Sequence, residues 1–262
     1  MNISRNLWYV FQYIRPSVII FLYEKFTHLK SRLHYSKAYN HKVTNKIIVC
    51  GMARSGSTLL YNYLRQGLGV NQGEYTYLRS EEDVASFILS CSQDKEVIKI
   101  HHYSPLFLKK CQEDKSNQII FSYRDLRDVS ASFVQKGWVN SLDEFLRYKL
   151  SSLVVVCSIY YASDLVRKIS YQALIDFDLH QVFDSLGLTQ EVNEVKDNLS
   201  AEFNVEKWIV DGVNKVNPLS GYHDNHINDP RPGKYSKLFT KKELDFLMYN
   251  SYFVHWIDIT NR

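Results

Sequence analysis

A glycine-spaced loop near residue 50 carries residue types that bind phosphate. Gly51 and Gly56 have the spacing of the glycines in a nucleotide-binding P-loop, and Thr58 stands where that motif ends in Ser or Thr. Ser57, however, occupies the position of the lysine that reaches the β- and γ-phosphates of a triphosphate, and a cation, Arg54, stands three residues earlier. The loop is therefore predicted to bind a phosphorylated nucleotide through backbone N–H groups at a helix N-terminus, and not to cleave a triphosphate.

A second phosphate-binding pattern begins where another strand is expected to end. Ser132 follows Arg124 by eight positions. On a helix that begins near Asp125, Ser132 lies two turns in, on a face that Arg124 can reach. A guanidinium and a hydroxyl that converge in this way match the oxygens of a phosphate. We interpret Asp125 as a helix cap and Arg127 and Asp128 as solvated charges.

A lysine and a histidine share one side of a third segment, residues 97–102. In an extended strand Lys99 and His101 point to the same side, and His102 points to the other. The pair would supply a cation and, because histidine titrates near neutral pH, a base. We therefore predict that Lys99 and His101 act together, and we interpret His102 as structural.

Strand-like and helix-like patterns alternate from residue 46 to about residue 187. Strands are expected at residues 46–50, 97–101, 118–123 and 168–171. Helices are expected at residues 57–67, from residue 105, and at 125–136, 142–167, 180–186, 191–199 and 241–252, with a long loop at 211–235. Such alternation predicts a three-layer, P-loop-like α/β fold with a central parallel sheet flanked by helices. Ligands of such sheets bind at the carboxyl ends of the strands, where all three motifs fall.

The composition is that of one globular domain. The chain has 262 residues, of which 45% are hydrophobic, enough for an ample core. A net charge of +4 suits an anionic ligand and is too small to indicate nucleic-acid binding. The cysteines form no C-x-x-C pair, so we expect reduced thiols and a cytoplasmic location. His223, Asp224, His226 and Asp229 are too loosely spaced to indicate a metal site.

Residues 1–45 differ from the rest of the chain and are expected to form a basic, aromatic helical extension. Residues 1–46 hold eight Lys and Arg against one acid, Glu24, together with an apolar run. The Arg15-Pro16 pair divides this run, so neither half reaches the ~20 residues of a membrane span. No small-residue cleavage site follows, so a secretory signal is not expected. Packing against the domain, peripheral contact of residues 1–40 with an anionic membrane, and a signal anchor all stay open.

The three motifs together resemble those of a known enzyme family. Gly-x-x-Arg-Ser-Gly-Ser-Thr-Leu-Leu from Gly51, Lys-x-His from Lys99 and Tyr-Arg-Asp-x-Arg-Asp-Val-x-x-Ser from Tyr123 resemble, in this order, the motifs of sulfotransferases that use 3′-phosphoadenosine 5′-phosphosulfate (PAPS). Residues 169–174 are similar to the family's Tyr-Glu-Asp-Leu strand, and residues 231–240 to the segment that closes over the cofactor. Arg54 stands where the cytosolic small-molecule enzymes have a lysine, as it does in many carbohydrate and bacterial members of the family.

The same comparison shows departures from the family pattern. Leu59 stands where a tryptophan often stacks on the adenine, and Gln172 and Ala173 replace acids. The closing segment is shorter, with tyrosine in place of tryptophan. These differences affect the expected adenine contacts more than the phosphate contacts. The resemblance implies a sulfotransferase-like α/β domain at residues 46–262.

The resemblance also implies roles for individual residues. His101 would be the general base, with Glu74 as the alternative that some branches use, and Lys99 and Arg54 would stabilise charge on the departing phosphate. The cofactor would be held by Arg54, Ser55, Gly56, Ser57, Thr58, Arg124, Ser132, Tyr171, Arg231 and Gly233. No metal would be required. The acceptor would be a hydroxyl or amine of a glycan, a lipid or a small molecule, and no nucleic acid is expected as a partner.

Two other functions stay open on the sequence. A P-loop kinase or NTPase with an altered loop would depend on magnesium and bind ATP, and the serine at position 57 disfavours it. A non-catalytic nucleotide-binding module of the same fold would not need both Lys99 and His101.

Overall fold

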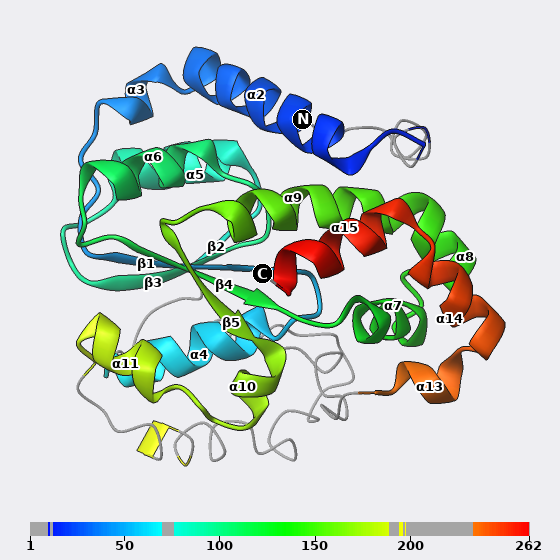
Figure 1. Cartoon of the computed structure of the whole chain (residues 1–262). Helices are drawn as coiled ribbons and strands as arrows, with labels where there is room; N and C mark the ends of the chain where they lie inside the picture. Colours follow the sequence, from blue (N-terminus) through cyan, green and yellow to red (C-terminus); the bar gives the residue numbers. More distant parts are fainter. Residues whose placement is uncertain are drawn as a thin grey trace, which may run out of the picture.

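The computed structural model describes residues 10, 13–69, 76–188, 194–195, 197 and 233–261. Its centre is a five-stranded sheet in the order β2-β3-β1-β4-β5, in which every pair of neighbouring strands is parallel (Figure 1). The strands are β1 (Lys46–Gly51), β2 (Tyr77–Leu78), β3 (Glu96–Ile100), β4 (Gln118–Tyr123) and β5 (Val166–Ser170). Helices cover both faces, which confirms the predicted three-layer α/β fold.

The two faces of the sheet have separate cores because side chains alternate along each strand. On β1, Ile47 and Val49 pack with Leu60 and Leu64 of α4 (Ser57–Gly67). Ile48 and Cys50 point into the larger core on the opposite face. This alternation of buried side chains explains why β1 is apolar throughout and was predicted from its composition.

Figure 1 shows which helices cover each face. With α4 lie α10 (Tyr171–Ile175) and α11 (His180–Leu186). The opposite face carries α2 (Pro16–His34), α3 (Ser36–Tyr39), α5 (Glu81–Ser90), α6 (Pro105–Glu113), α9 (Ser151–Ala162) and α15 (Ser251–Thr260). Beyond the carboxyl ends of the strands lie α7 (Leu126–Gln135), α8 (Leu142–Phe145), the π-helical turn η1 (Leu146–Leu150), α13 (Tyr235–Leu238) and α14 (Lys241–Met248).

Three predicted elements differ from those observed. The helix expected at residues 142–167 is divided into α8, η1 and α9, and it ends at Ala162. β5 begins at Val166, two residues before the predicted start. The earlier start was missed because Arg167 and Lys168 are exposed on this edge strand and weaken its apolar pattern. The closing helix is two helices, since the Asn250 side chain accepts a hydrogen bond from Tyr252 N (2.9 Å) and begins α15.

β2, α5, α10 and α13 were not predicted, and the strand expected at 168–171 ends at Ser170, because Tyr171 begins α10. β2 has only two residues, and α5 lies in a stretch that the sequence analysis did not assign. α5 nevertheless has a full capping box, in which Ser80 and Asp83 exchange side-chain and backbone hydrogen bonds. That Ser-x-x-Asp pattern was the available signal. The helix expected at 191–199 and the loop at 211–235 lie mostly outside the described residues.

None of the helices in the described part of the chain has the combination of length and hydropathy that a membrane span requires. α2 contacts α9 and α6, so one of its faces packs on the domain. The boundary between an extension at 1–45 and a domain at 46–262 stays a prediction.

Candidate functional site

The loop after β1 is fixed to the neighbouring strand β4 by one buried serine. Ser55 Oγ lies 2.6 Å from Met52 O, 2.9 Å from Ser122 O and 2.7 Å from Ser122 Oγ. Arg54 (φ 67°) and Gly56 (φ 82°) both adopt left-handed backbone conformations, which direct the chain into α4. Ser55 therefore supports the shape of the loop, and its predicted contact with the cofactor stays a prediction.

Gly51 leaves no room for a side chain at the end of β1. An added Cβ would lie 2.2 Å from Ser122 Oγ and 2.9 Å from the Ser122 carbonyl oxygen. We expect Gly51→Ala to lower the free energy of unfolding by about 3 kcal/mol, the upper end of the usual cost of overpacking, because a backbone atom must move. Urea denaturation measures this loss.

Gly137→Ala is the matched control for that substitution. Gly137, unlike Gly51, has a left-handed backbone (φ 66°), and a Cβ added there would meet nothing within 4 Å. Only the conformational cost of about 1 kcal/mol is then expected. Equal losses for the two variants would contradict the importance of the contact with Ser122.

A lysine of β3 and a serine of α7 contact the loop and the first turn of α4. Lys99, next to last in β3, is only 2% exposed, and its Nζ donates a hydrogen bond to Thr58 Oγ1 in the first turn of α4. Arg54 Nε donates to Ser132 Oγ of α7 at 2.8 Å, and its guanidinium lies 5.4 Å from the Trp138 ring centroid. The structure thus brings together the loop, Lys99 and Ser132, while the expected convergence of Arg124 and Ser132 on one phosphate stays a prediction.

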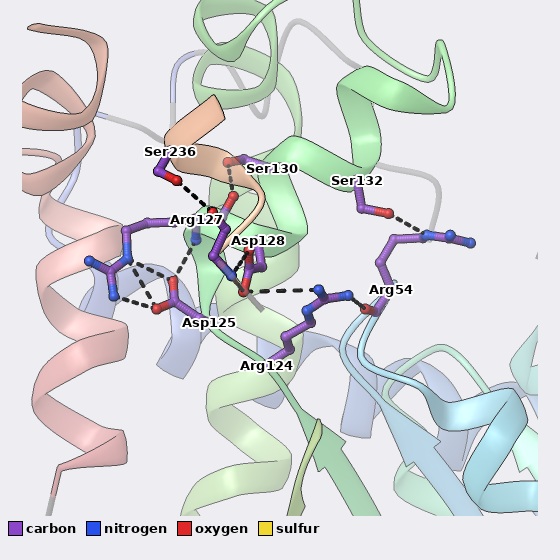
Figure 2. Close-up of polar contacts among 9 residues, drawn as sticks. Arg54, Arg124, Asp125, Arg127, Asp128, Ser130, Ser132 and Ser236 are labelled. Carbon is purple, nitrogen blue, oxygen red and sulfur yellow. Dashed lines mark hydrogen bonds and ion pairs between the residues drawn. The ribbon is translucent and has the colours of Figure 1, made fainter. Parts of the chain in front are cut away.

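Arg124 lies on the other side of the loop (Figure 2). Its Nη1 donates to Arg54 O at 3.4 Å, and its Cζ lies 4.0 Å from the Tyr171 ring centroid. Tyr171 also covers Gly56, since a Cβ added there would be 2.9 Å from the tyrosine ring. Arg124 Nε is buried and has no hydrogen-bond partner within the part of the chain that the structure describes. A buried, unpaired donor of this kind is costly and suits a site that receives an acceptor.

The prediction that Asp128 is a solvated charge is wrong. Asp128 is 4% exposed, its Oδ2 lies 3.9 Å from Arg124 Nη2, and it accepts the Gly233 N–H at 2.9 and 3.1 Å (Figure 2). An aspartate four residues after an arginine, across a helix start, was the signal that could have found it. Arg127 is half-buried and pairs with Asp125 at 2.5 Å, so it is not simply solvated either.

Burial and repulsion by a neighbouring arginine make the charged forms of Lys99 and Arg54 less favourable, which lowers their pKa values. Burial is the larger cause, and the nearby Arg54 cation the smaller, of a pKa of about 7 for Lys99. Burial and then the Arg124 cation lower the pKa of Arg54 from its ordinary value. Both shifts mean that the charged forms are held at a cost that an anionic ligand would relieve.

His101 is exposed directly after β3. Its ring meets the Tyr77 ring edge-on, with centroids 5.2 Å apart, and Lys99 Nζ lies 5.5 Å from the same Tyr77 centroid. Lys99 and His101 therefore share one side of the strand end. The neighbouring His102 is directed elsewhere, with Nε2 3.3 Å from Glu81 Oε2, in agreement with a structural role.

Some predicted residues cannot be placed in this site. Glu74, Arg231 and the histidines and aspartates at 223–229 lie outside the described residues. Gly233 is described, and its N–H is already used by Asp128. Among the described residues, no group of three or more His, Cys, Asp or Glu side chains is placed to hold a metal ion.

No protein-family model matches the sequence, and no curated protein matches it either. The structure is similar to a mouse sulfotransferase, SULT7A1, complexed with PAP (TM-score 0.58, 14% identity, 86% of this chain and 92% of that chain).

The structure is also similar to retinol dehydratase. The complex with androsterone and PAP has a TM-score of 0.58 and 17% identity over 88% of this chain and 84% of that chain. The complex with retinol and PAP has a TM-score of 0.55 and 16% identity over 86% and 84%. At these identities the likeness establishes the fold.

Proposed function

We propose that this protein is a sulfotransferase that transfers a sulfuryl group from PAPS to a hydroxyl or amine acceptor. The observation that carries the proposal is the convergence of Arg54, Lys99 and Arg124 around a P-loop-like turn that lacks the triphosphatase lysine. The likeness to folds crystallised with PAP, 3′-phosphoadenosine 5′-phosphate, supports the same nucleotide as ligand.

Two groups of residues fit the two phosphates of that nucleotide. The N–H groups at the start of α4, with Ser57, Thr58 and Lys99, would hold the 5′-phosphate. Arg124, with Ser132, would hold the 3′-phosphate, and the unpaired Nε of Arg124 is the donor that fits it best. Tyr171 beside the adenine, and Arg231 and Gly233 at the 3′-phosphate, belong to this proposal.

The chemistry that these residues would perform is an in-line displacement governed by positioning and charge. PAPS supplies a sulfuryl group attached to a phosphate leaving group. His101 accepts the proton of the acceptor hydroxyl as the new S–O bond forms. Lys99 and Arg54 stabilise the negative charge left on the phosphate oxygen. His101 lies exposed at the strand end, so an acceptor can reach it from solvent.

The acceptor side of the site is aromatic. Tyr77 contacts His101 and Lys99, and Trp138, which is 50% exposed, lies against Arg54. Such rings suit the face of a sugar or of another ring, so a glycan, glycolipid or small hydroxylated molecule is the proposed acceptor class. We also propose that the protein is most similar to the carbohydrate and bacterial sulfotransferases and that it requires no metal. Its proposed location is cytoplasmic, with peripheral membrane contact through residues 1–40.

Calorimetric titration with PAP in the absence of magnesium tests the proposal, with ATP as the comparison ligand. Micromolar binding of PAP and weak binding of ATP are expected. That result would justify a screen of acceptors with labelled PAPS. Magnesium-dependent binding of ATP, or no binding of PAP, would instead favour the kinase or overturn the nucleotide assignment.

The affinity for PAP is expected to fall as the pH rises above 7. In the free protein Lys99, with a pKa of about 7, loses its charge above that pH, while the nucleotide phosphates, with second pKa values near 6, are already fully charged. Binding then requires proton uptake, which weakens the affinity by up to roughly tenfold per pH unit. Titrations between pH 7 and pH 9 measure the slope.

Lys99→Arg is the control for this pH dependence. Arginine stays charged throughout that range, so its affinity for PAP is expected to change little with pH. A wild-type profile as flat as that of Lys99→Arg would show that Lys99 does not contact the ligand.

A further inference from the structure

α2 is held on the domain by its inner face. Ile19 is 3% exposed, and Ser31 Oγ donates a hydrogen bond to Glu81 Oε1 of α5 at 2.9 Å. Tyr23 packs against Tyr103, with ring centroids 6.4 Å apart. These contacts, with those to α9 and α6, fix the direction in which the opposite face of the helix points.

The outer face of α2 is apolar and uncovered by any described residue. Its large side chains are Val18 (46% exposed), Phe21 (56%), Leu22 (55%), Phe26 (50%), Leu29 (57%) and Leu33 (68%). Five of them, all but Phe21, recur at intervals of three or four residues and so form one stripe along the helix. We call these five residues the α2 stripe. A continuous exposed apolar surface of this kind marks an interaction site.

Basic residues border the stripe. Lys25 and Arg32 follow one edge, Lys30 follows the other, and Glu24 is the only acid in residues 1–46. The eight basic residues give residues 1–46 a charge of +7, so the rest of a chain with net charge +4 carries −3. An apolar stripe with cationic edges is the pattern of a helix that lies in the interface of an anionic bilayer.

A second copy of the chain is the competing occupant. Leu22, Phe26, Leu29 and Leu33 also have the a/d spacing of a coiled coil. In a parallel pair in that register, however, Lys25 would face Lys30 of the partner helix. In an antiparallel pair these flanking positions would again bring basic residues together. The charge pattern therefore disfavours self-association and favours an anionic surface.

We propose that the α2 stripe docks the protein on an anionic membrane surface. A helix of 19 residues extends for about 28 Å, long enough for all five side chains to enter the boundary between headgroups and acyl chains. Because α2 is packed on α9, the membrane would hold the whole domain, with α4 on the far side of the sheet (Figure 1). This docking does not depend on the proposed nucleotide chemistry.

Vesicle co-sedimentation of the full chain tests this surface. Wild type is expected to sediment with vesicles that contain phosphatidylserine, to bind phosphatidylcholine vesicles far more weakly, and to be released by high salt. The triple variant Leu22→Ser, Phe26→Ser, Leu29→Ser is expected to lower the partition coefficient roughly tenfold or more, and Lys25→Glu with Arg32→Glu to remove the preference for phosphatidylserine. Unchanged partitioning of the triple variant would overturn the proposal.

Phe246→Ser provides the matched control. Phe246 is 63% exposed on α14, away from the α2 stripe, so its replacement is expected to leave partitioning unchanged. Circular dichroism and thermal unfolding check that each variant is folded. Sedimentation velocity without lipid tests whether a second copy of the chain covers the stripe instead. A wild-type dimer that is absent in the triple variant would overturn the membrane assignment. The assay contains no nucleotide, so its failure and a failure of PAP binding are distinguishable.

Discussion

Arg124→Ala is expected to weaken the binding of PAP by roughly 100-fold or more while the protein stays folded. The guanidinium would make two charge-assisted hydrogen bonds to the 3′-phosphate, each worth ~1.5 kcal/mol at the least, and tenfold in affinity is 1.4 kcal/mol. Tyr171, Arg54 O and Asp128 hold this side chain before any ligand arrives, so little ordering is needed on binding. Calorimetric titration measures the change.

Two further variants separate a lost phosphate contact from general damage. Arg147→Ala removes an exposed arginine that pairs with Asp143 on the surface, and it is expected to bind PAP like wild type. Arg124→Ala leaves Asp128 buried without its cation, which by itself lowers stability. Adding Asp128→Asn should recover stability without recovering binding. If binding returns with stability, Arg124 is a structural residue and not a phosphate ligand.

The phosphate loop and the parallel arrangement of the strands could be predicted because their signals are local. Gly51, Gly56 and Thr58 define the turn by spacing alone, and the short apolar run of β1, ended by Gly51, favours a buried strand over a helix. Parallel strands then place every motif at the same edge of the sheet. Arg54 and Ser132, 78 residues apart, belong to two of these motifs, and the structure places them in hydrogen-bond contact.

The contacts that were missed depend on tertiary packing. Asp128 looks like any charged residue near a helix start until Gly233, 105 residues later, donates its N–H to it. Tyr77 belongs to a strand of two residues, too short for any periodic signal, although it touches both Lys99 and His101. The π-helical turn η1 between α8 and α9 has no residue pattern that distinguishes it from an α-helix in the sequence.

His101→Ala is expected to lower the turnover number by roughly 10²- to 10⁴-fold while leaving the affinity for PAP unchanged, as removal of a general base does. The separation follows from geometry, because His101 contacts Tyr77, whereas Thr58 contacts Lys99 and Arg124 contacts the loop on the side proposed to hold the phosphates. Measuring both quantities on one variant therefore distinguishes catalysis from binding. A variant that loses PAP binding in parallel would place His101 among the nucleotide ligands instead.

The neighbouring histidine gives the sharpest comparison for this prediction. His102 pairs with Glu81 and is partly buried, so His102→Ala is expected to lower the melting temperature and to leave the turnover number of the folded protein nearly unchanged. The alternative base is tested beside it. If His101→Ala keeps its activity and Glu74→Ala loses it, the proton of the acceptor passes to the Glu74 carboxylate. The contacts of Tyr77 with Lys99 and His101 then serve only to order the end of β3. If only His101→Ala is inactive, the exposed histidine at the end of β3 is the group that activates the acceptor.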